Sequence, residues 1–467
     1  MMTTDSNLLA SQGGAPSTRP LRILPNPSAL RRGNGEQAVV LGFWLLVGQY
    51  LLATMLPMLI EGGRYTKVPQ GVCLLGGFVL LAIGAFRLTD GRLFHASGFP
   101  IYFQVVLAAL LVWGGVVILR SCTADLVTLC NLFFLPLNGS AWLVPLVAVC
   151  GAFPKVWRRL LPAMLRHLAI AMAAGVFWLA AGTRDSGYLY YGLPVLLTCF
   201  YYIGRSSRWL TVWGLVFFVV TAFLSGMRSV VMPGLFYIAC VPVIGWMRNR
   251  GRDRGVVVVS TIVALCVTGI AYSVYFRTLE LSFLPDRFQP YIEKFQDGGF
   301  KNTREPLYGE VWDDLSGNDL LIGRGALGTY FSPIYYAMHV REMANRQAFY
   351  ENPGYREHFE TAFHYMVLKG GFVMVILFYA ATIPAVWLGL FSSHNWFARA
   401  CALVVAEWLV MTFVYALPEV RLQYFMFWLA VGACWSRPIR QMSETDVQIM
   451  FAVLRPSTAP APAGAHA

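Results

Sequence analysis

Charged residues are scarce in this chain. Asp, Glu, Lys and Arg together make up 13% of its 467 residues, whereas a soluble domain carries about 25%. Hydrophobic residues make up 57%, and a soluble protein of this composition would expose large apolar patches to water. The composition therefore excludes an ordinary cytoplasmic enzyme and predicts a protein that crosses a membrane several times.

The sequence also lacks the usual signatures of soluble metal, nucleotide and hydrolase sites. None of its nine cysteines belongs to a C-x-x-C pair, and nearly all lie in or beside apolar runs, which favours small core residues over a disulfide or zinc framework. There is no Walker sequence, no D-x-D motif and no G-x-S-x-G elbow. We therefore expect no metal and no cofactor, and a substrate that arrives already activated.

The net charge of +12 is unevenly distributed along the chain. Residues 277–360 hold nine Lys/Arg and thirteen Asp/Glu and carry a net charge of −4, whereas the rest of the chain carries +16. The basic residues outside this segment lie between apolar runs, where they set the orientation of membrane helices. The basic excess is therefore no argument for a nucleic-acid partner.

Between two polar tails, the chain contains twelve apolar runs long enough to cross a membrane, which takes about 20 residues. The fourth run contains Pro136, Asn138 and Pro145, which predict either a broken helix or a re-entrant segment. We expect an all-α polytopic membrane protein with about twelve transmembrane helices. The runs are 37–60, 68–86, 100–119, 124–152, 161–182, 188–204, 209–225, 229–247, 255–276, 362–390, 398–417 and 421–436.

Lys and Arg in the short connections predict the orientation of the chain. With the N-terminus inside, the inner segments carry twenty of these residues and the short outer segments carry seven. Both termini are therefore predicted to be cytoplasmic, and one large loop between helices 9 and 10 lies on the outer side. The predicted organisation is a disordered cytoplasmic tail at 1–36, helices 1–9 at 37–276, the outer loop at 277–361, helices 10–12 at 362–436 and a second cytoplasmic tail at 437–467.

Arg228 is the first candidate site residue. It lies in the outer turn 224–229, which contains two serines and a glycine between two apolar runs. An arginine at a helix boundary often extends to the membrane interface and has no other role. A compact turn instead holds the guanidinium close to the helices, where its planar group of donors suits a phosphate.

Residues 301–330 contain the second candidate group. Arg304 and Arg324 supply cations, and Arg324 lies in the glycine-rich stretch 321–330, where backbone amides are expected to join it in gripping an anion. The glycines lack the strand and helix that accompany a nucleotide-binding loop. The acidic residues beside these arginines are typical of a solvated helix face.

Residues 355–371 open the tenth apolar run and contain the candidate base. If this stretch is helical, Arg356, Glu360 and His364 follow at i, i+4 and i+8 and share one face. Glu360 would then accept a hydrogen bond from the His364 ring and leave its other nitrogen as a base. Lys369 lies one turn deeper on another face, where it either extends to the interface or contacts a lipid phosphate.

These three regions together resemble the bacterial O-antigen polymerase and O-antigen ligase superfamily. The resemblance rests on the turn Ser225–Ser229, the stretch Leu321–Gly325 in a large loop late in the chain, and His364 followed by Leu368–Gly371. Their order and sidedness match the family along the whole predicted topology. The family often has His-Asn at this point, whereas this chain has His364 followed by Tyr365, which fits a divergent exopolysaccharide polymerase.

The resemblance implies an oligosaccharide donor carried on undecaprenyl pyrophosphate, used at the periplasmic face of the bacterial inner membrane. It implies that Arg228 stabilises the pyrophosphate leaving group, with Arg304 or Arg324 as the next candidates. His364, oriented by Glu360, would take the proton from the acceptor hydroxyl. No metal ion is required if arginines neutralise the diphosphate. Expected partners are the lipid bilayer, a flippase and chain-length or export proteins.

One base without a nucleophile implies inversion at the anomeric carbon, whereas retention would require a carboxylate nucleophile such as Glu310 or Asp313. Within the same class, the chain is alternatively a ligase that moves a finished glycan to a lipid or protein acceptor. In a different class, it is a transporter or flippase of a lipid-linked sugar, although the sequence shows no related halves of the kind that transporters have. A signalling or assembly scaffold ranks last.

Overall fold

Helices dominate the described part of the chain. The computed structural model describes residues 34–59, 67–93, 98–123, 125–180, 236, 304–336, 353–359, 361–413 and 422–450. The helices before residue 181 are α1 (Asn34–Leu59), α2 (Lys67–Leu88), α3 (Ile101–Leu119), α4 (Leu126–Phe134), the 3₁₀ helix η3 (Gly139–Leu146), α5 (Val147–Gly151) and α6 (Pro154–Ala180). The later elements are α12 (Arg304–Asp314), α13 (Asn318–Ile322), β1 (Tyr330–Phe331), β2 (Tyr355–Arg356), α15 (Ala362–Phe391), α16 (Trp396–Met411), α17 (Leu422–Trp435), α18 (Arg437–Gln441) and α19 (Glu444–Met450).

Three described helices are long and apolar enough to cross a membrane, which is consistent with a helical membrane protein. They are Val68–Leu88, Ile101–Leu119 and Ala362–Phe391, close to the predicted runs 68–86, 100–119 and 362–390. The fourth predicted run is interrupted, as its prolines indicate, since Leu126–Phe134 and Gly139–Gly151 form a pair bent by 41°. Counted as one span, this pair raises the number to four.

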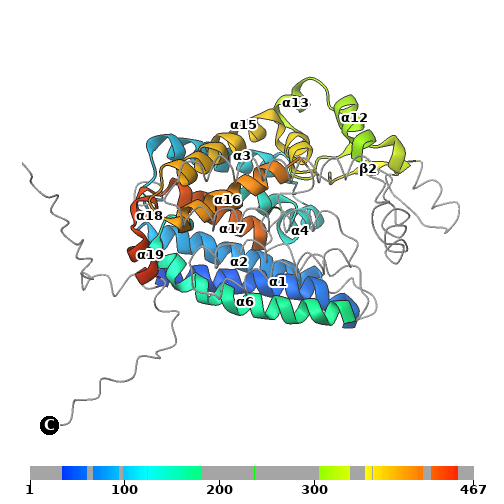
Figure 1. The fold of residues 1–467 in the computed structure, drawn as a ribbon. Coiled ribbons are helices and arrows are strands. Elements are labelled where there is room, and N and C mark those ends of the chain that lie inside the picture. Colours follow the sequence, from blue (N-terminus) through cyan, green and yellow to red (C-terminus); the bar gives the residue numbers. More distant parts are fainter. Residues whose placement is uncertain are drawn as a thin grey trace, which may run out of the picture.

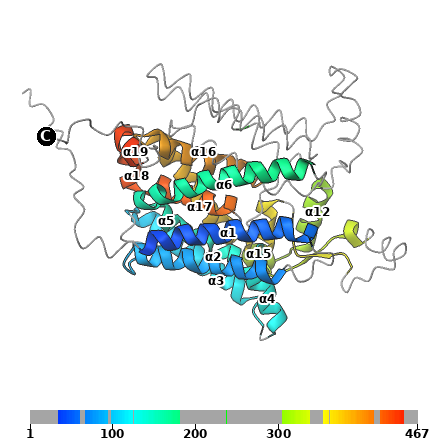
Figure 2. The same ribbon diagram turned by 90° about the horizontal axis from the view of Figure 1, so that it is seen from below.

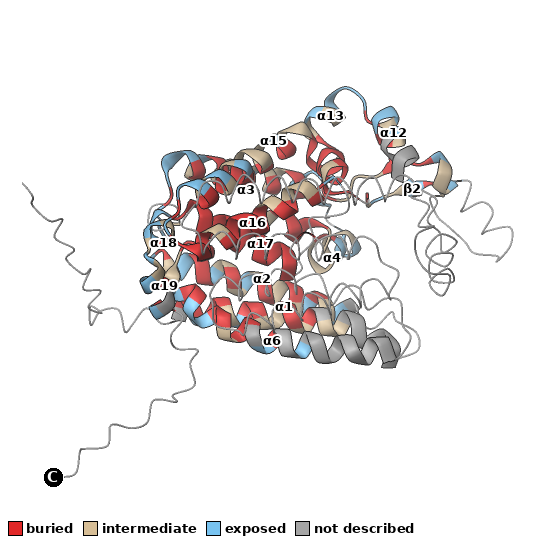
Figure 3. Cartoon of the chain, in the orientation of Figure 1, coloured by how far each residue is buried: buried red, intermediate tan, exposed pale blue. Residues whose placement is uncertain are grey.

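Apolar side chains cover much of the outer surface of these helices. Val112 of α3 is 67% exposed, and Ile376 and Trp387 of α15 are 64% and 62% exposed. Figure 3 shows exposed positions along α3 and α15, while α16 and α17 are mostly buried. Apolar surface of this extent suits contact with lipid rather than with water.

The centre of the bundle is α17, all of whose residues are buried. Its Gly432 lies against α5 so closely that a Cβ there would stand 1.9 Å from the carbonyl oxygen of Ala148. Gly42 of α1 and Gly77 of α2 meet in a similar way. Small residues at such crossings allow membrane helices to approach closely and gain packing energy.

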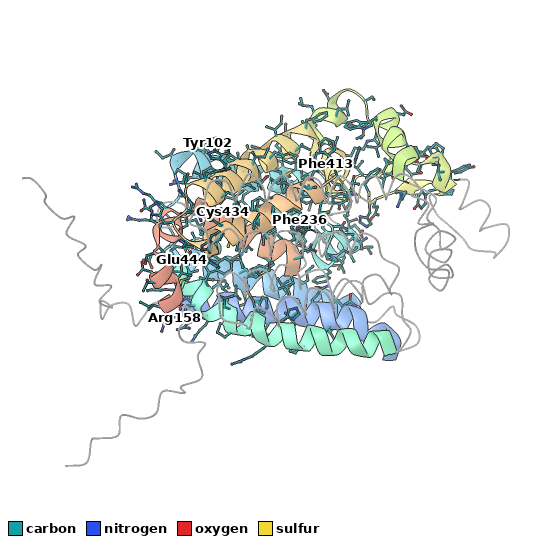
Figure 4. The ribbon with its side chains drawn as sticks, in the orientation of Figure 1. Tyr102, Arg158, Phe236, Phe413, Cys434 and Glu444 are labelled. Carbon is teal, nitrogen blue, oxygen red and sulfur yellow. The ribbon has the colours of Figure 1, made fainter. Side chains whose placement is uncertain are left out.

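Two opposite ends of the bundle can be distinguished. At one end, which we call the basic end, the Arg159 side chain pairs with Glu36 at 2.8 Å, and the Trp396 amide donates to Glu444 at 2.6 Å. Figure 4 shows Arg158 and Glu444 at this end, with Phe413 far from them. The opposite end carries α12, α13 and β2 (Figures 1 and 2). Arg158 and Arg159, two of the residues predicted to be cytoplasmic, therefore lie at the basic end.

Several predictions fall outside the described residues. These include the runs 188–204, 209–225 and 255–276, and all of 229–247 except Phe236. The total of twelve helices, the cytoplasmic placement of both termini and the sidedness of the loop stay predictions.

Helix α15 is broken at Gly371, which has φ 66° and ψ −172° inside the helix. The carbonyls of Leu368 and Lys369 accept hydrogen bonds from the amides of Arg324 and Gly325, at 2.8 and 2.9 Å. The indole of Trp113 donates to the next carbonyl, that of Gly370, at 2.8 Å. Donors from outside the helix therefore replace the helical bonds that the break removes, as an apolar environment demands.

Residues 304–336, which we call the docked segment, are attached to the bundle at this break. Besides the two amides above, the Ala326 amide donates to the carbonyl of Val117 at 2.9 Å. The Arg120 side chain donates to the carbonyls of Ile322 and Gly323, at 2.7 and 2.6 Å. The docked segment thus lies between the end of α3 and the first turns of α15.

We expect Gly371→Ala to destabilise this junction. The glycine occupies a backbone region that other residues adopt only at a cost of about 1–3 kcal/mol. A Cβ there would also stand 2.1 Å from the carbonyl oxygen of Leu321. The loss is measured as a lower thermal unfolding midpoint of the purified chain in detergent.

The matched control is Gly115→Ala in α3, where a Cβ would meet nothing within 4 Å. Alanine at that position should change stability by no more than about 1 kcal/mol, in the stabilising direction. Equal effects of the two substitutions would contradict the importance of the break.

Candidate functional site

His364 lies in the first turn of α15 and is 8% exposed. Its Nδ1 is 2.8 Å from the hydroxyl oxygen of Thr361, the residue that precedes the helix. Three aromatic rings surround it, with centroid distances of 4.9 Å to Phe359, 5.5 Å to Trp312 and 5.4 Å to Phe363. The imidazole is therefore held by the Thr361 hydroxyl and enclosed by three aromatic rings.

Trp312 of α12 connects this surround to the surface. Its ring is 37% exposed, and it stacks on Phe372 at 6.0 Å with an interplanar angle of 17°. The docked segment thus places a half-exposed tryptophan directly beside a buried histidine. Aromatic rings of this kind present a flat face on which the apolar side of a sugar ring can pack.

The prediction that Arg356, Glu360 and His364 share one face of a helix is wrong. Arg356 belongs to β2, in which it pairs with Tyr330 of β1, and α15 begins only at Ala362. A left-handed Gly354 with φ 87° precedes β2, Thr361 is extended, and the described residues between them, 355–359, are not helical. Glu360 lies outside the described residues.

Thr361 is the partner of His364 that sequence reasoning missed. The signal was present, since Thr is a favoured residue immediately before a helix and His364 follows three positions later. In this geometry the Thr361 hydroxyl orients the His364 ring, a role that was predicted for the Glu360 carboxylate.

Arg324 does not present its guanidinium to an open anion site. It forms ion pairs with Asp314 and Asp319, the latter at 2.7 Å, and donates to the carbonyls of Thr329 and Asp314, each at 2.8 Å. These bonds use four of its five N–H donors. The prediction that Arg324 grips a pyrophosphate is therefore not supported, because the two carboxylates already neutralise it.

The glycine-rich stretch around Arg324 packs against neighbouring backbone rather than forming an anion-binding loop. Gly323 and Gly325 have φ of 70° and 86°, and a Cβ on Gly323 would stand 2.4 Å from the Lys369 backbone. The amides of residues 324–328 all donate within the protein, to carbonyls or, for Leu327, to the hydroxyl of Ser121 at 2.9 Å. The predicted contribution of these amides to anion binding is wrong, because the break in α15 and the end of α3 occupy them.

The two carboxylates considered for a retaining reaction differ in their surroundings. Glu310 accepts from the Ser332 hydroxyl at 2.6 Å and from the Ile334 amide at 3.1 Å, so both of its oxygens have partners. Asp313 is exposed on α12.

Two further cations were predicted to bind the pyrophosphate. Arg228 lies outside the described residues. Arg304 is the first residue of α12, and its side chain is not among those that the structure describes.

Lys369 is fully buried and does not extend to the interface as predicted. Its ammonium donates to the carbonyl of Gly328 at 2.7 Å and lies 5.3 Å from the centre of the Tyr365 ring. The Tyr365 hydroxyl donates to the carbonyl of Leu137 at 2.6 Å, and Trp142 stacks on its ring at 5.7 Å. The docked segment covers Lys369 and prevents it from reaching the surface.

Arg356 and His358 lie near Lys369. The Arg356 guanidinium stacks on Tyr335 at 3.6 Å and donates to the Tyr330 hydroxyl at 3.2 Å. Burial, followed by the positive charges of Lys369 and Arg356, lowers the pKa of His358 to about 4. The structure thus brings Arg356 and Lys369, two cations of the predicted stretch 355–371, close to His358.

Within the described residues, no three His, Cys, Asp or Glu side chains are grouped in a way that would hold a metal ion. Comparisons of the chain with protein-family models, curated proteins and solved structures find no match.

Arg324→Gln should lower the stability of the docked segment, because it leaves two carboxylates and two carbonyls without their donor. We expect a loss of about 1–3 kcal/mol, the usual effect of stranding partly buried polar groups. Thermal unfolding in detergent measures it, with exposed Arg92→Gln as the control. If Arg324→Gln unfolds like the wild type, Arg324 does not hold the segment.

His358 makes the folded protein sensitive to acid. Its folded pKa of about 4 lies below the ordinary value of 6.5, so protonation favours the unfolded chain. This part of the stability is complete above about pH 6.5 and is lost as the pH falls toward about 4. His358→Gln should therefore reduce the drop in unfolding midpoint between about pH 7 and about pH 4.5. An unchanged drop would show that the ring is not held neutral.

Proposed function

We propose that this chain is a metal-independent glycosyltransferase that polymerises oligosaccharide units linked to undecaprenyl pyrophosphate, at the periplasmic face of the bacterial inner membrane. The observation that carries the proposal is the pairing of buried His364 with half-exposed Trp312, 5.5 Å apart, at the end of a long apolar helix. The sequence motifs that resemble O-antigen polymerases and ligases support the choice of substrate.

In the proposed reaction, His364 takes the proton from the hydroxyl of the acceptor sugar. Thr361, 2.8 Å from Nδ1, holds the ring in one orientation, and we assign Nε2 as the nitrogen that takes the proton. Trp312 offers the face on which the acceptor sugar packs, which brings its hydroxyl toward the imidazole.

The departing pyrophosphate needs positive charge close to the anomeric carbon. We assign this role to Arg228 and Arg304, because Arg324 is neutralised by Asp314 and Asp319. Attack by the acceptor hydroxyl without an enzyme nucleophile inverts the anomeric centre. The occupied oxygens of Glu310 favour this course over retention through that residue.

The test uses the purified full chain in lipid vesicles, supplied with one lipid-linked repeat unit. His364→Ala should reduce chain growth by about 10²–10⁴-fold, the usual contribution of a general base. Trp312→Ala should weaken use of the acceptor, and Trp312→Phe should restore part of it because a ring remains. Product length is read by gel electrophoresis and mass spectrometry.

The matched control is His394→Ala, since His394 is exposed just beyond the other end of α15. Wild-type polymer from the His364→Ala variant at equal protein level would refute the proposal. Transfer that occurs only when a second acceptor is added would identify a ligase. Movement of the lipid-linked unit across the bilayer without new glycosidic bonds would identify a flippase.

A further inference from the structure

Lys369 presents a buried positive charge that the described protein only partly satisfies. The residue is 0% exposed, and its ammonium has three N–H donors but one hydrogen-bond acceptor in the described part of the chain, the carbonyl of Gly328. The other close group is the face of the Tyr365 ring. A buried amine with unused hydrogen-bond donors is costly, and inside a membrane helix such a residue usually has a function.

His358 stands beside Lys369 with an unsatisfied nitrogen that points inward. Its side chain is 39% exposed, yet its Nδ1 is buried and has no hydrogen-bond partner among the described residues. The ring lies 6.1 Å from the Tyr365 ring, on which Lys369 also rests. One edge of the imidazole therefore faces solvent while the other faces the cluster.

Arg356 adds a permanent positive charge. One hydrogen bond to the Tyr330 hydroxyl and stacking on Tyr335 fix the guanidinium, and most of its N–H donors have no acceptor in the described part. Glu357 is the acidic residue in this group, but its carboxylate lies 3.9 Å from His358 and is 49% exposed. Glu357 also acts on Lys369, so one carboxylate partly offsets the two cationic side chains.

We propose that Lys369, His358 and Arg356 form a binding site for a phosphoryl group. Ammonium and guanidinium donors together match the several oxygens and the double charge of a phosphate or diphosphate. Tyr365, Trp142 and Tyr335 wall the site and keep out water, which strengthens each charged contact. The phosphoryl group belongs either to a lipid headgroup or to a free anion.

This site differs from the one assigned to glycosyl transfer. Lys369 and Tyr365 are four residues apart and share one face of α15, whereas His364 is turned by about 100° from Tyr365. The inference rests on these contacts and does not require that the chain make a polysaccharide. The two proposals can therefore fail separately.

The first arm of the test measures free anions. The full chain in maltoside micelles, which contain no phosphate, is titrated with inorganic phosphate and with pyrophosphate by calorimetry. Binding should be saturable, and Lys369→Met should weaken it about tenfold or more, while Lys155→Met at the exposed basic end should leave it unchanged. NMR should show the His358 pKa rising when the anion binds, because a nearby negative charge stabilises the imidazolium.

The second arm measures lipids. Phosphatidic acid is added to the same micelles and its retention is measured by native mass spectrometry, with diacylglycerol as the matched lipid without phosphate. Retention of phosphatidic acid that phosphate cannot displace identifies a lipid headgroup as the ligand, and displacement identifies a site that accepts both. Loss of retention in Lys369→Met is expected in either case.

His358→Gln keeps the proposal testable if Lys369→Met does not fold, as judged by gel filtration. It should weaken binding of pyrophosphate and abolish the NMR response. Equal affinity of the wild type and both folded variants, or no binding of phosphate, pyrophosphate or phosphatidic acid, overturns the proposal.

Discussion

The break in α15 at Gly371 is the constraint on which the rest of the described structure depends. A helix that crosses an apolar medium must pair every carbonyl, and the break leaves three of them without helical partners. The amides of Arg324 and Gly325 and the indole of Trp113 supply the missing donors. The indole of Trp113 joins α3 to α15 across 257 positions of the sequence, and the Arg120 side chain joins α3 to the docked segment across 202 and 203.

This junction also determines the surroundings of His364 and Lys369, which lie on different faces of the first turns of α15. On one face the docked segment brings Trp312 against His364, in aromatic and largely apolar surroundings. On the other face the carbonyl of Gly328 holds Lys369 under cover, near Arg356 and His358. A histidine enclosed by aromatic rings and a cationic cluster are different chemical environments, and the helix between them keeps them apart.

The apolar runs predicted most of the described helices, because burial in lipid acts on each segment by itself. The broken fourth run was foreseen, since prolines disrupt helical hydrogen bonds wherever they occur. The break in α15 was not foreseen, although Gly370 and Gly371 stand in the sequence. A pair of glycines becomes a break only when outside donors satisfy the freed carbonyls, and those donors are distant in sequence.

The sequence by itself determined that this is an apolar, helical chain, that His364 opens a long apolar helix, and that the cations near it are few. Composition and local pattern suffice for these conclusions, because hydrophobicity is a property of each residue. Only the tertiary structure decided which cations are available. Arg324 is neutralised by Asp314 and Asp319, whereas Lys369 is buried with one acceptor. The partners of a charge come from chain folding, which brings distant donors and acceptors to one place.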